Sequence, residues 1–269
     1  MLRAFTQAFR TPDLRKKILF TIAIIAIYRL GTTVPAPGVD YGRVQDCLKL
    51  VGNGGIYGLL NLFSGGALLQ LSVFALGIMP YITASIIVQL LVVVIPRFEA
   101  LKKQGQAGQT RLTQYTRYLT VALGILQSTA IIALARSGRL FQASGATCTP
   151  LPDISIFRVS TLVITMTAGT AVIMWLGELI TERGVGNGMS LLIFTSIIAR
   201  APAQGIGILK TAKVFGSIVI IAMAIMIITF VIFVEQAQRR IPVQYAKRMI
   251  GRRMYGGTST YLPMKVNQA

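Results

Sequence analysis

Few residues of this chain could carry out chemistry. Its 269 residues include no histidine, two cysteines and only eight acidic side chains. General acid–base catalysis, metal binding and covalent catalysis each need several such groups brought close together. The serines and threonines within the apolar stretches are more typical of contacts between membrane helices. We therefore expect no enzymatic activity, no cofactor and no metal site.

The densest combination of charge and glycine lies between Trp175 and Ser190. It consists of Glu178, Glu182, Arg183, Gly184, Gly186 and Gly188. Glycines permit left-handed turns, so the pattern predicts a tight hairpin that fixes two helices against each other. A position at the water interface would by itself explain why Glu178 and Glu182 are acidic. The alternative is that they have a functional role.

A second feature is an apolar passage in two unequal parts. The segment from Gly58 to Phe63 is too short to cross a bilayer and is stopped by Ser64, Gly65 and Gly66, whereas Leu68 to Ile95 is a run of 28 residues. The chain is thus expected to enter the membrane twice. Non-helical backbone persists at membrane depth only beside protein or a water-filled cavity, so the pattern predicts a pore with a segment in its mouth.

The composition indicates a membrane protein throughout. Apolar residues make up 54% of the chain, and the mean hydropathy is +0.66. Six spans are expected from hydrophobicity. They are Ile18–Val34, Leu68–Ile95, Tyr118–Ala135, Val159–Ile180, Met189–Ile208 and Val214–Val234.

The net charge of +19 is distributed unevenly between the two sides of these spans. Eighteen basic residues fall on one side and eight on the other, and Arg29 lies inside the first span. The positive-inside rule then places the N-terminus in the cytoplasm. The fifth span is the weakest because Pro202 interrupts it, but omitting it would move the basic stretch Arg239–Lys265 outside.

Several smaller features leave alternatives open. Thr11, Pro12 and Asp13 predict a helix start, and the residues before them form either an interfacial helix or a frayed basic tail. Arg29 either snorkels or pairs structurally, or it faces the pore. Cys47 and Cys148 both fall in outer loops, where a disulfide is possible without being required. The stretch Tyr261–Ala269 is typical of the approach to another span, so we expect a longer protein.

Taken together, several strings resemble the bacterial SecY family, the central subunit of a protein-translocation channel. They occur in the family's order as Tyr28–Gly31, Pro35–Gly38, Asn61–Ala67, Phe74–Ile82, Gln114–Tyr118, Trp175–Gly188, Gln238–Ile241, Tyr245–Arg248 and Pro263–Asn267. The resemblance implies an all-α polytopic membrane protein with six transmembrane helices and a short re-entrant plug, which is half of a ten-helix clamshell channel. Its implied parts are a cytoplasmic interfacial segment (1–17), the first five-helix half (18–208, with the plug at 58–67), and the sixth helix with a basic loop (209–269).

The implied function is passage of unfolded secretory polypeptides across the bacterial cytoplasmic membrane, with lateral release of membrane-protein segments into it. The implied partners are the small subunits SecE and SecG, the SecA motor ATPase, the ribosome, signal peptides, nascent chains and lipid. A secondary transporter of a small solute is the alternative, since broken helices also occur there. It is disfavoured because Glu178, Glu182 and Glu235 all lie at cytoplasmic helix ends.

The resemblance also assigns roles to three sets of residues. The pore ring would include Ile78, Ile82, Met189 and Ile193, although an aliphatic pair spaced by four is usually lipid-facing or core. The plug would include Leu59, Leu60, Asn61, Leu62, Phe63, Ser64, Gly65 and Gly66, for which an ordinary re-entrant turn is the alternative. The docking loop would include Arg239, Arg240, Lys247, Arg248, Arg252 and Arg253, for which the alternative is purely topological charge.

Overall fold

The computed structural model describes residues 11–51, 61, 63–143, 146–151, 155–211, 213–243, 248–250, 253–255 and 260–265. The chain divides into two compact units, residues 1–202 and 203–269, which are described separately.

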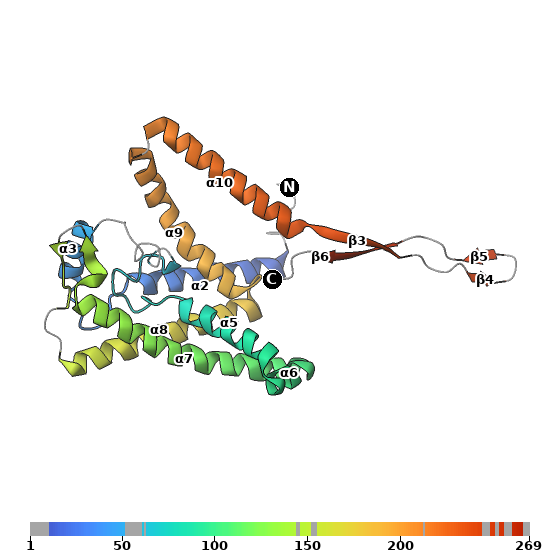
Figure 1. The fold of residues 1–269 in the computed structure, drawn as a ribbon, viewed down its shortest axis with the longest axis horizontal. Helices are drawn as coiled ribbons and strands as arrows, with labels where there is room; N and C mark the ends of the chain where they lie inside the picture. The colour runs from blue at the N-terminus through green and yellow to red at the C-terminus, as the bar shows by residue number, and fades with distance from the viewer. Residues whose placement is uncertain are drawn as a thin grey trace. The chain divides into compact units, whose positions relative to one another are not determined.

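Most described residues of the first unit are helical, apart from a series of turns after residue 63 and one short hairpin. Its elements are α2 (Pro12–Thr33), α3 (Tyr41–Val51), α5 (Met79–Val94), α6 (Pro96–Lys103), α7 (Gln106–Arg136), the 3-10 turn η1 (Arg139–Phe141), β1 (Gln142–Ala143), β2 (Ala146–Thr147), α8 (Ile156–Arg183) and most of α9 (Gly188–Thr211). The helix α7 packs against α5 and α8, and α2 packs against α8 (Figure 1).

The predicted helix start at Pro12 is confirmed. Thr11 precedes α2 with an extended backbone, Pro12 occupies the first turn, and Asp13 lies near the positive end of the helix dipole. The helix continues unbroken to Thr33, so residues 12–17 belong to the same helix as the first expected span. Residues 1–10, with the expected interfacial helix, lie outside the described residues.

The expected second span, Leu68–Ile95, is wrong in its first part. Regular helix begins only at Met79, and residues 64–78 form consecutive turns. Gly65, Gly66 and Gly77 have φ values of 66°, 98° and 57°, and Leu71 has a φ of 47°. Right-handed helix cannot pass through left-handed backbone, so hydrophobicity alone overestimates the helix here. We call residues 61–78 the turn segment; residue 62 lies outside the described residues.

At its other end, α5 stops before Pro96. The ring of Pro96 disfavours helical backbone at Ile95, whose φ and ψ are −102° and 116°. The following helix, α6, leaves at a bend of 98°.

Four helices in the described part of the chain are long and apolar enough to cross a membrane. They are α7, α8, the part of α9 up to Gly207, and α10 (Lys213–Gln236), and the bent pair of α5 and α6 makes a fifth if counted as one span. They match the last four of the six expected spans, and Pro202 does not end α9. By contrast, α2 does not qualify, because Arg15, Lys16 and Lys17 occupy its start and Arg29 lies near its end.

Small and hydroxylated residues line the close contact between α7 and α8. The Ser128 and Thr167 hydroxyl oxygens lie 3.4 Å apart across the two helices, and each hydroxyl is also within donating distance of a carbonyl of its own helix, so its single proton can serve only one of the two partners. Gly124 leaves room for the Thr167 methyl group. Such small and hydroxylated residues are typical of contacts between helices in lipid.

The second unit contains α10 and an antiparallel ribbon that the sequence analysis treated as a loop. The strands are β3 (Gln238–Val243), β4 (Arg248–Ile250), β5 (Arg253–Tyr255) and β6 (Thr260–Lys265). Strand β3 pairs with β6 and β4 pairs with β5. Proline has no N–H group to donate to a neighbouring strand. In the two-stranded pairing of β3 with β6 each strand has one free edge, so the nitrogen atoms of Pro242 and Pro263 can face that edge without the loss of a hydrogen bond.

The side chains of α10 are apolar and exposed within their unit, with Phe215 81% and Phe233 73% exposed. A helix that is apolar all round requires surrounding lipid or protein, so α10 fits a membrane span.

The turn segment generates a paired stability prediction. The Ser64 hydroxyl donates to the Asn61 carbonyl and accepts from the Leu68 amide, whereas the Ser72 hydroxyl oxygen is buried without a hydrogen-bond partner in the described structure. Ser64→Ala should therefore lower the free energy of unfolding by about 1–3 kcal/mol, and Ser72→Ala should leave it unchanged or raise it. Thermal unfolding of the purified protein in detergent checks both, and equal losses would contradict the hydrogen-bonding account.

Candidate functional site

The turn segment satisfies its own backbone through short-range hydrogen bonds. The Gly66 amide donates to the Asn61 carbonyl (2.8 Å), and the Leu69 amide donates to the Asn61 side-chain oxygen (3.2 Å). Further turns close from Ser72 to Ala67 and from Gly77 to Phe74. These bonds allow irregular backbone to remain buried, where an unpaired amide or carbonyl would cost several kcal/mol.

The end of α2 and the residues after it hold the turn segment in place. The Val73 amide donates to the Val34 carbonyl and the Ala36 amide donates to the Leu71 carbonyl, each at 3.0 Å. Pro35 and Ser72 form the antiparallel bridge between these two pairs. The short strand-like pairing fixes the register of the turn segment against the first expected span.

The glycine pair in the turn segment packs directly against two arginines. The Arg29 guanidinium donates to the Gly65 carbonyl at 3.3 Å, and a Cβ atom on Gly66 would overlap the Arg200 guanidinium. Arg29 therefore pairs structurally, which is one of the two roles expected for it. Of the predicted plug, Asn61, Ser64, Gly65 and Gly66 are buried and Phe63 is exposed, whereas Leu59, Leu60 and Leu62 lie outside the described residues.

The four predicted pore-ring residues lie in one apolar cluster. Ile78 is 3% exposed in its centre, and Ile82, Met189 and Ile193 pack partly buried around it. The Ile82 amide donates to the Ile78 carbonyl, so the two side chains share one helix face as expected. We call this group the apolar cluster; its buried members are Ile24, Tyr28, Phe74, Ile78, Ile173, Leu176, Ile180 and Leu192.

A cavity of about 450 Å³, lined by both apolar and polar side chains, adjoins the apolar cluster. Ile82, Met189 and Ile193 line part of its wall, and Ile78 does not. The rest of the wall is formed by Tyr81, Ser85, Ile86, Thr113, Arg117, Glu178, Thr181, Glu182, Asn187 and Ser190. The helices α5, α7, α8 and α9 therefore surround a space that changes from aliphatic to charged.

An ion pair that the sequence analysis missed crosses this cavity wall. Arg117 Nε donates to Glu178 Oε1 at 2.9 Å, and Arg117 Nη2 lies 2.7 Å from Oε2. The Glu178 side chain is only 17% exposed, and that of Arg117 is 47% exposed. The two-point geometry ties α7 to α8, so Glu178 is more than an acid at the water interface.

The glycine hairpin between α8 and α9 works mainly through close approach. Only Gly186 has a left-handed backbone, with a φ of 74°. A Cβ atom on Gly188 would overlap the Gly177 carbonyl oxygen, and one on Gly184 would lie 2.6 Å from both the Ile180 carbonyl oxygen and Thr21 Oγ1. The predicted tight hairpin is confirmed, but two of its three glycines are needed for space.

Side chains cap the start of α9 in the same hairpin. The Asn187 side-chain oxygen accepts from the Met189 and Ser190 amides, and Thr181 Oγ1 accepts from the Gly188 amide. This arrangement satisfies the free amides at the helix N-terminus and fixes Met189 within the apolar cluster.

Tyr28 is a second contribution that the sequence analysis did not single out. Its hydroxyl shares a buried hydrogen bond of 2.6 Å with the Ser196 hydroxyl, and its ring stacks on Phe74 with centroids 6.0 Å apart. Tyr28 thus connects α2, the turn segment and α9. The glycine at position 31 is the local sequence feature that could have indicated a close contact here. Its lack of a side chain leaves room for the Phe74 ring, which a Cβ atom at Gly31 would overlap.

The basic residues of the predicted docking loop belong to the ribbon of the second unit. Arg239 and Arg240 are exposed on β3, opposite Met264 and Pro263 of β6. Arg248 begins β4 and Arg253 begins β5, where the structure describes the backbone, and Lys247 and Arg252 lie outside the described residues.

Comparison with known proteins gives consistent results. A family model described as SecY matches residues 72–269. Protein translocase subunit SecY of Streptomyces galbus is 64% identical over 274 residues, which cover all of this chain and 63% of that protein. The protein of the same name from Mycobacterium bovis is 62% identical over 272 residues, covering all of this chain and 61% of the relative. The chain thus spans less than two thirds of the length of these curated relatives.

Two solved structures share the fold at low sequence identity. One, described as the structure of a protein conducting channel, has a TM-score of 0.59 and 16% identity, and the match covers 93% of this chain and 52% of that one. The other, Sec61 in the canine ribosome-channel complex from the endoplasmic reticulum, has a TM-score of 0.56 and 15% identity, with coverages of 85% and 49%.

The hairpin predicts that Gly188→Ala destabilises the protein. The added methyl group would push α9 away from the α8 backbone at a cost of about 1–3 kcal/mol, which should lower the thermal unfolding temperature. Gly205→Ala is the matched control, because it lies in the same helix and a Cβ there meets nothing within 4 Å. Equal effects of the two substitutions would refute the close-approach argument.

A double-mutant cycle tests the ion pair. Arg117→Gln and Glu178→Gln should each reduce thermal stability, and the double variant should lose less than the sum, with a coupling of about 1 kcal/mol. The coupling is expected to be modest because Arg117 is half exposed. Strictly additive losses would show that the two side chains do not stabilise each other.

Proposed function

The chain belongs to the SecY family, and we propose from this membership that it forms one wall of a channel for unfolded polypeptides. In this proposal the channel passes secretory chains across the cytoplasmic membrane and releases membrane-protein segments sideways into the lipid. It performs no chemistry of its own, and a partner supplies the energy.

One observation carries the proposal beyond family membership. Irregular, hydrogen-bonded backbone is buried among apolar helices, next to the apolar cluster that borders a cavity with charged side chains in its wall. This is the arrangement expected where a non-helical segment closes a passage, since lipid alone could not solvate such backbone.

Within the passage, we assign Ile78, Ile82, Met189 and Ile193 to the constriction and residues 58–67 to a plug. Aliphatic side chains exclude water and ions while offering a moving polypeptide no hydrogen bonds that would retain it. The partial exposure of Ile82, Met189 and Ile193 toward the cavity supports their assignment. Ile78 would act from behind, by holding Ile82 in place.

The basic ribbon is assigned to partner docking on the cytoplasmic side. Arg239 and Arg240 lie on a two-stranded arm whose side chains are mostly exposed. Such exposed side chains are available to bind another molecule. Guanidinium groups suit both ribosomal RNA phosphates and acidic protein surfaces. The proposed partners are the ribosome, the SecA motor ATPase and the small subunits SecE and SecG. The N-terminus would lie in the cytoplasm.

The function is tested by depletion together with a leak measurement. Cells depleted of the full-length protein should accumulate unprocessed secretory precursors, and normal export would contradict the proposal. In vesicles, Ile82→Asn should raise the resting ion leak several-fold, because a polar amide in the constriction would let water and ions enter it. Val94→Asn is the matched control on the same helix, since Val94 is 75% exposed, lies about 120° around α5 from Ile82 and does not line the cavity. An equal leak from both variants would count against the constriction.

A further inference from the structure

We propose that Cys47 and Cys148 form an oxidation site on the outer face, where a protein carrying a reactive disulfide joins them, and that the bond holds α3 in place. The outer placement rests on the proposed function and its topology. The sequence left the pairing open, and the structure joins the two sulfur atoms, with the Cα atoms 5.5 Å apart.

The helix α3 is short and depends on its contacts with the rest of the chain. It contains 11 residues, which is too short for a stable isolated helix in water. Val44 and Cys47 are fully buried, whereas Tyr41, Gly42, Arg43 and Asp46 are exposed, so one narrow face makes the packing contacts.

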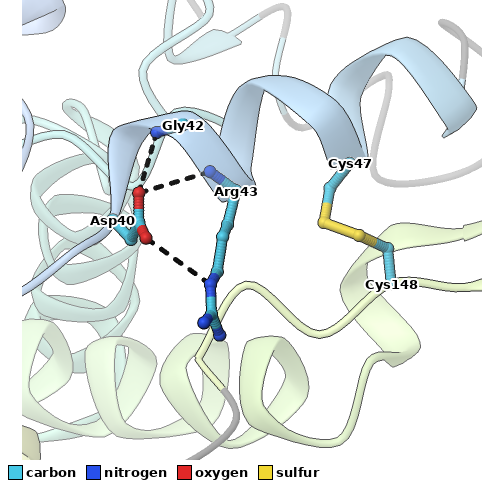
Figure 2. Close-up of polar contacts among 5 residues, drawn as sticks. All are labelled: Asp40, Gly42, Arg43, Cys47 and Cys148. Carbon is cyan, nitrogen blue, oxygen red and sulfur yellow. Dashed lines mark hydrogen bonds and ion pairs between the residues drawn. A yellow bond between two sulfur atoms is a disulfide. The ribbon is translucent and has the colours of Figure 1, made fainter.

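Polar contacts support the first half of α3, where the Gln45 side-chain amide also donates to the Tyr41 hydroxyl at 2.7 Å. The Asp40 carboxylate accepts from the Gly42 amide at 3.0 Å and the Arg43 amide at 3.4 Å, and it lies 3.5 Å from Arg43 Nε (Figure 2). Exposed pairs of this kind contribute little to stability. The disulfide lies about one helical turn beyond them and anchors the other half of the helix (Figure 2).

The bond connects α3 to the core that supports the turn segment. Cys47 belongs to a buried cluster with Leu69, Leu71 and Leu76 of the turn segment, and Cys148 packs against the same cluster. The two cysteines are 101 residues apart, so the closed loop contains the turn segment, α5, α6 and α7. A bond that closes so long a loop strongly restricts the unfolded chain.

The oxidation proceeds by two thiol–disulfide exchanges. The Cys148 thiolate, which is half-buried and therefore reachable, attacks the disulfide of the oxidant, forms a mixed disulfide and releases one oxidant thiol. The Cys47 thiolate then attacks Cys148 Sγ and releases the second oxidant thiol. Two thiols of this chain become one disulfide, the oxidant disulfide becomes a dithiol, and the two protons remain with the oxidant.

The oxidation state is tested by thiol labelling of the full-length protein in cells. Because Cys47 is buried, cells are quenched in acid and the protein is denatured in detergent before a maleimide polymer is added. Untreated protein should gain no adduct, and protein reduced after denaturation should gain two. Two adducts without reduction would overturn the oxidation site. Treatment of intact cells with a membrane-impermeant reductant before quenching should also expose both thiols, and protection from it would overturn the outer placement.

The holding role is tested by trypsin cleavage after Arg43 in right-side-out vesicles. A protease binds extended chain, so α3 must unfold locally before trypsin can cleave it. Reduction should make this local unfolding easier and raise the cleavage rate roughly tenfold. The variant Cys47→Ala/Cys148→Ala is the control, and it should be cleaved at the fast rate with or without reductant. Equal rates for oxidised and reduced wild-type protein would overturn the role. Neither assay requires channel activity, so their failure is distinct from a failure of the export test.

Discussion

The structure depends on one constraint, which is that buried backbone amides and carbonyls need partners even where the chain is not helical. The turn segment meets this constraint partly through its own Asn61 and Ser64, and partly through the two backbone bonds that join it to the residues after α2. Its left-handed glycines make these turns possible. Buried residues of α2, α3, α7, α8 and α9 pack against the apolar side chains of this segment.

The helices around the turn segment enclose two adjoining environments. On one side, Phe74 and Ile78 join Tyr28, Leu176 and Leu192 in the apolar cluster. Beyond Ile82 and Met189 the wall becomes polar, and the ion pair of Arg117 and Glu178 bridges α7 and α8 there. The close approach of α9 to α8 at Gly177 and Gly188 maintains this arrangement, because any side chain at Gly188 would open the wall. A water-filled entrance that ends in an aliphatic constriction is what a gated conduit requires.

Much of this architecture could be predicted from the sequence, because its signals are local. The last four spans, the start of α2, the hairpin after Arg183 and the shared face of Ile78 and Ile82 all follow from periodicity, proline and glycine. The shortened α5 could not be predicted from hydrophobicity, because the segment Leu68–Ile78 is as hydrophobic as a membrane-spanning helix. The Tyr28–Ser196 and Arg117–Glu178 pairs join residues 168 and 61 positions apart, which no local pattern reveals. The ribbon was missed because its short, exposed strands do not alternate between apolar and polar residues.

The central claim is that these helices present one particular face to a moving polypeptide. Photo-crosslinking from single positions in the full-length protein, during arrested translocation of a secretory chain, tests it most directly. Crosslinkers at Ile82 and Ile193 should form adducts with the arrested chain, whereas one at Val94, which is 75% exposed and lies about 120° around α5 from Ile82, should react with lipid instead. Adducts with the arrested chain from Val94 but not from Ile82 or Ile193 would contradict the account.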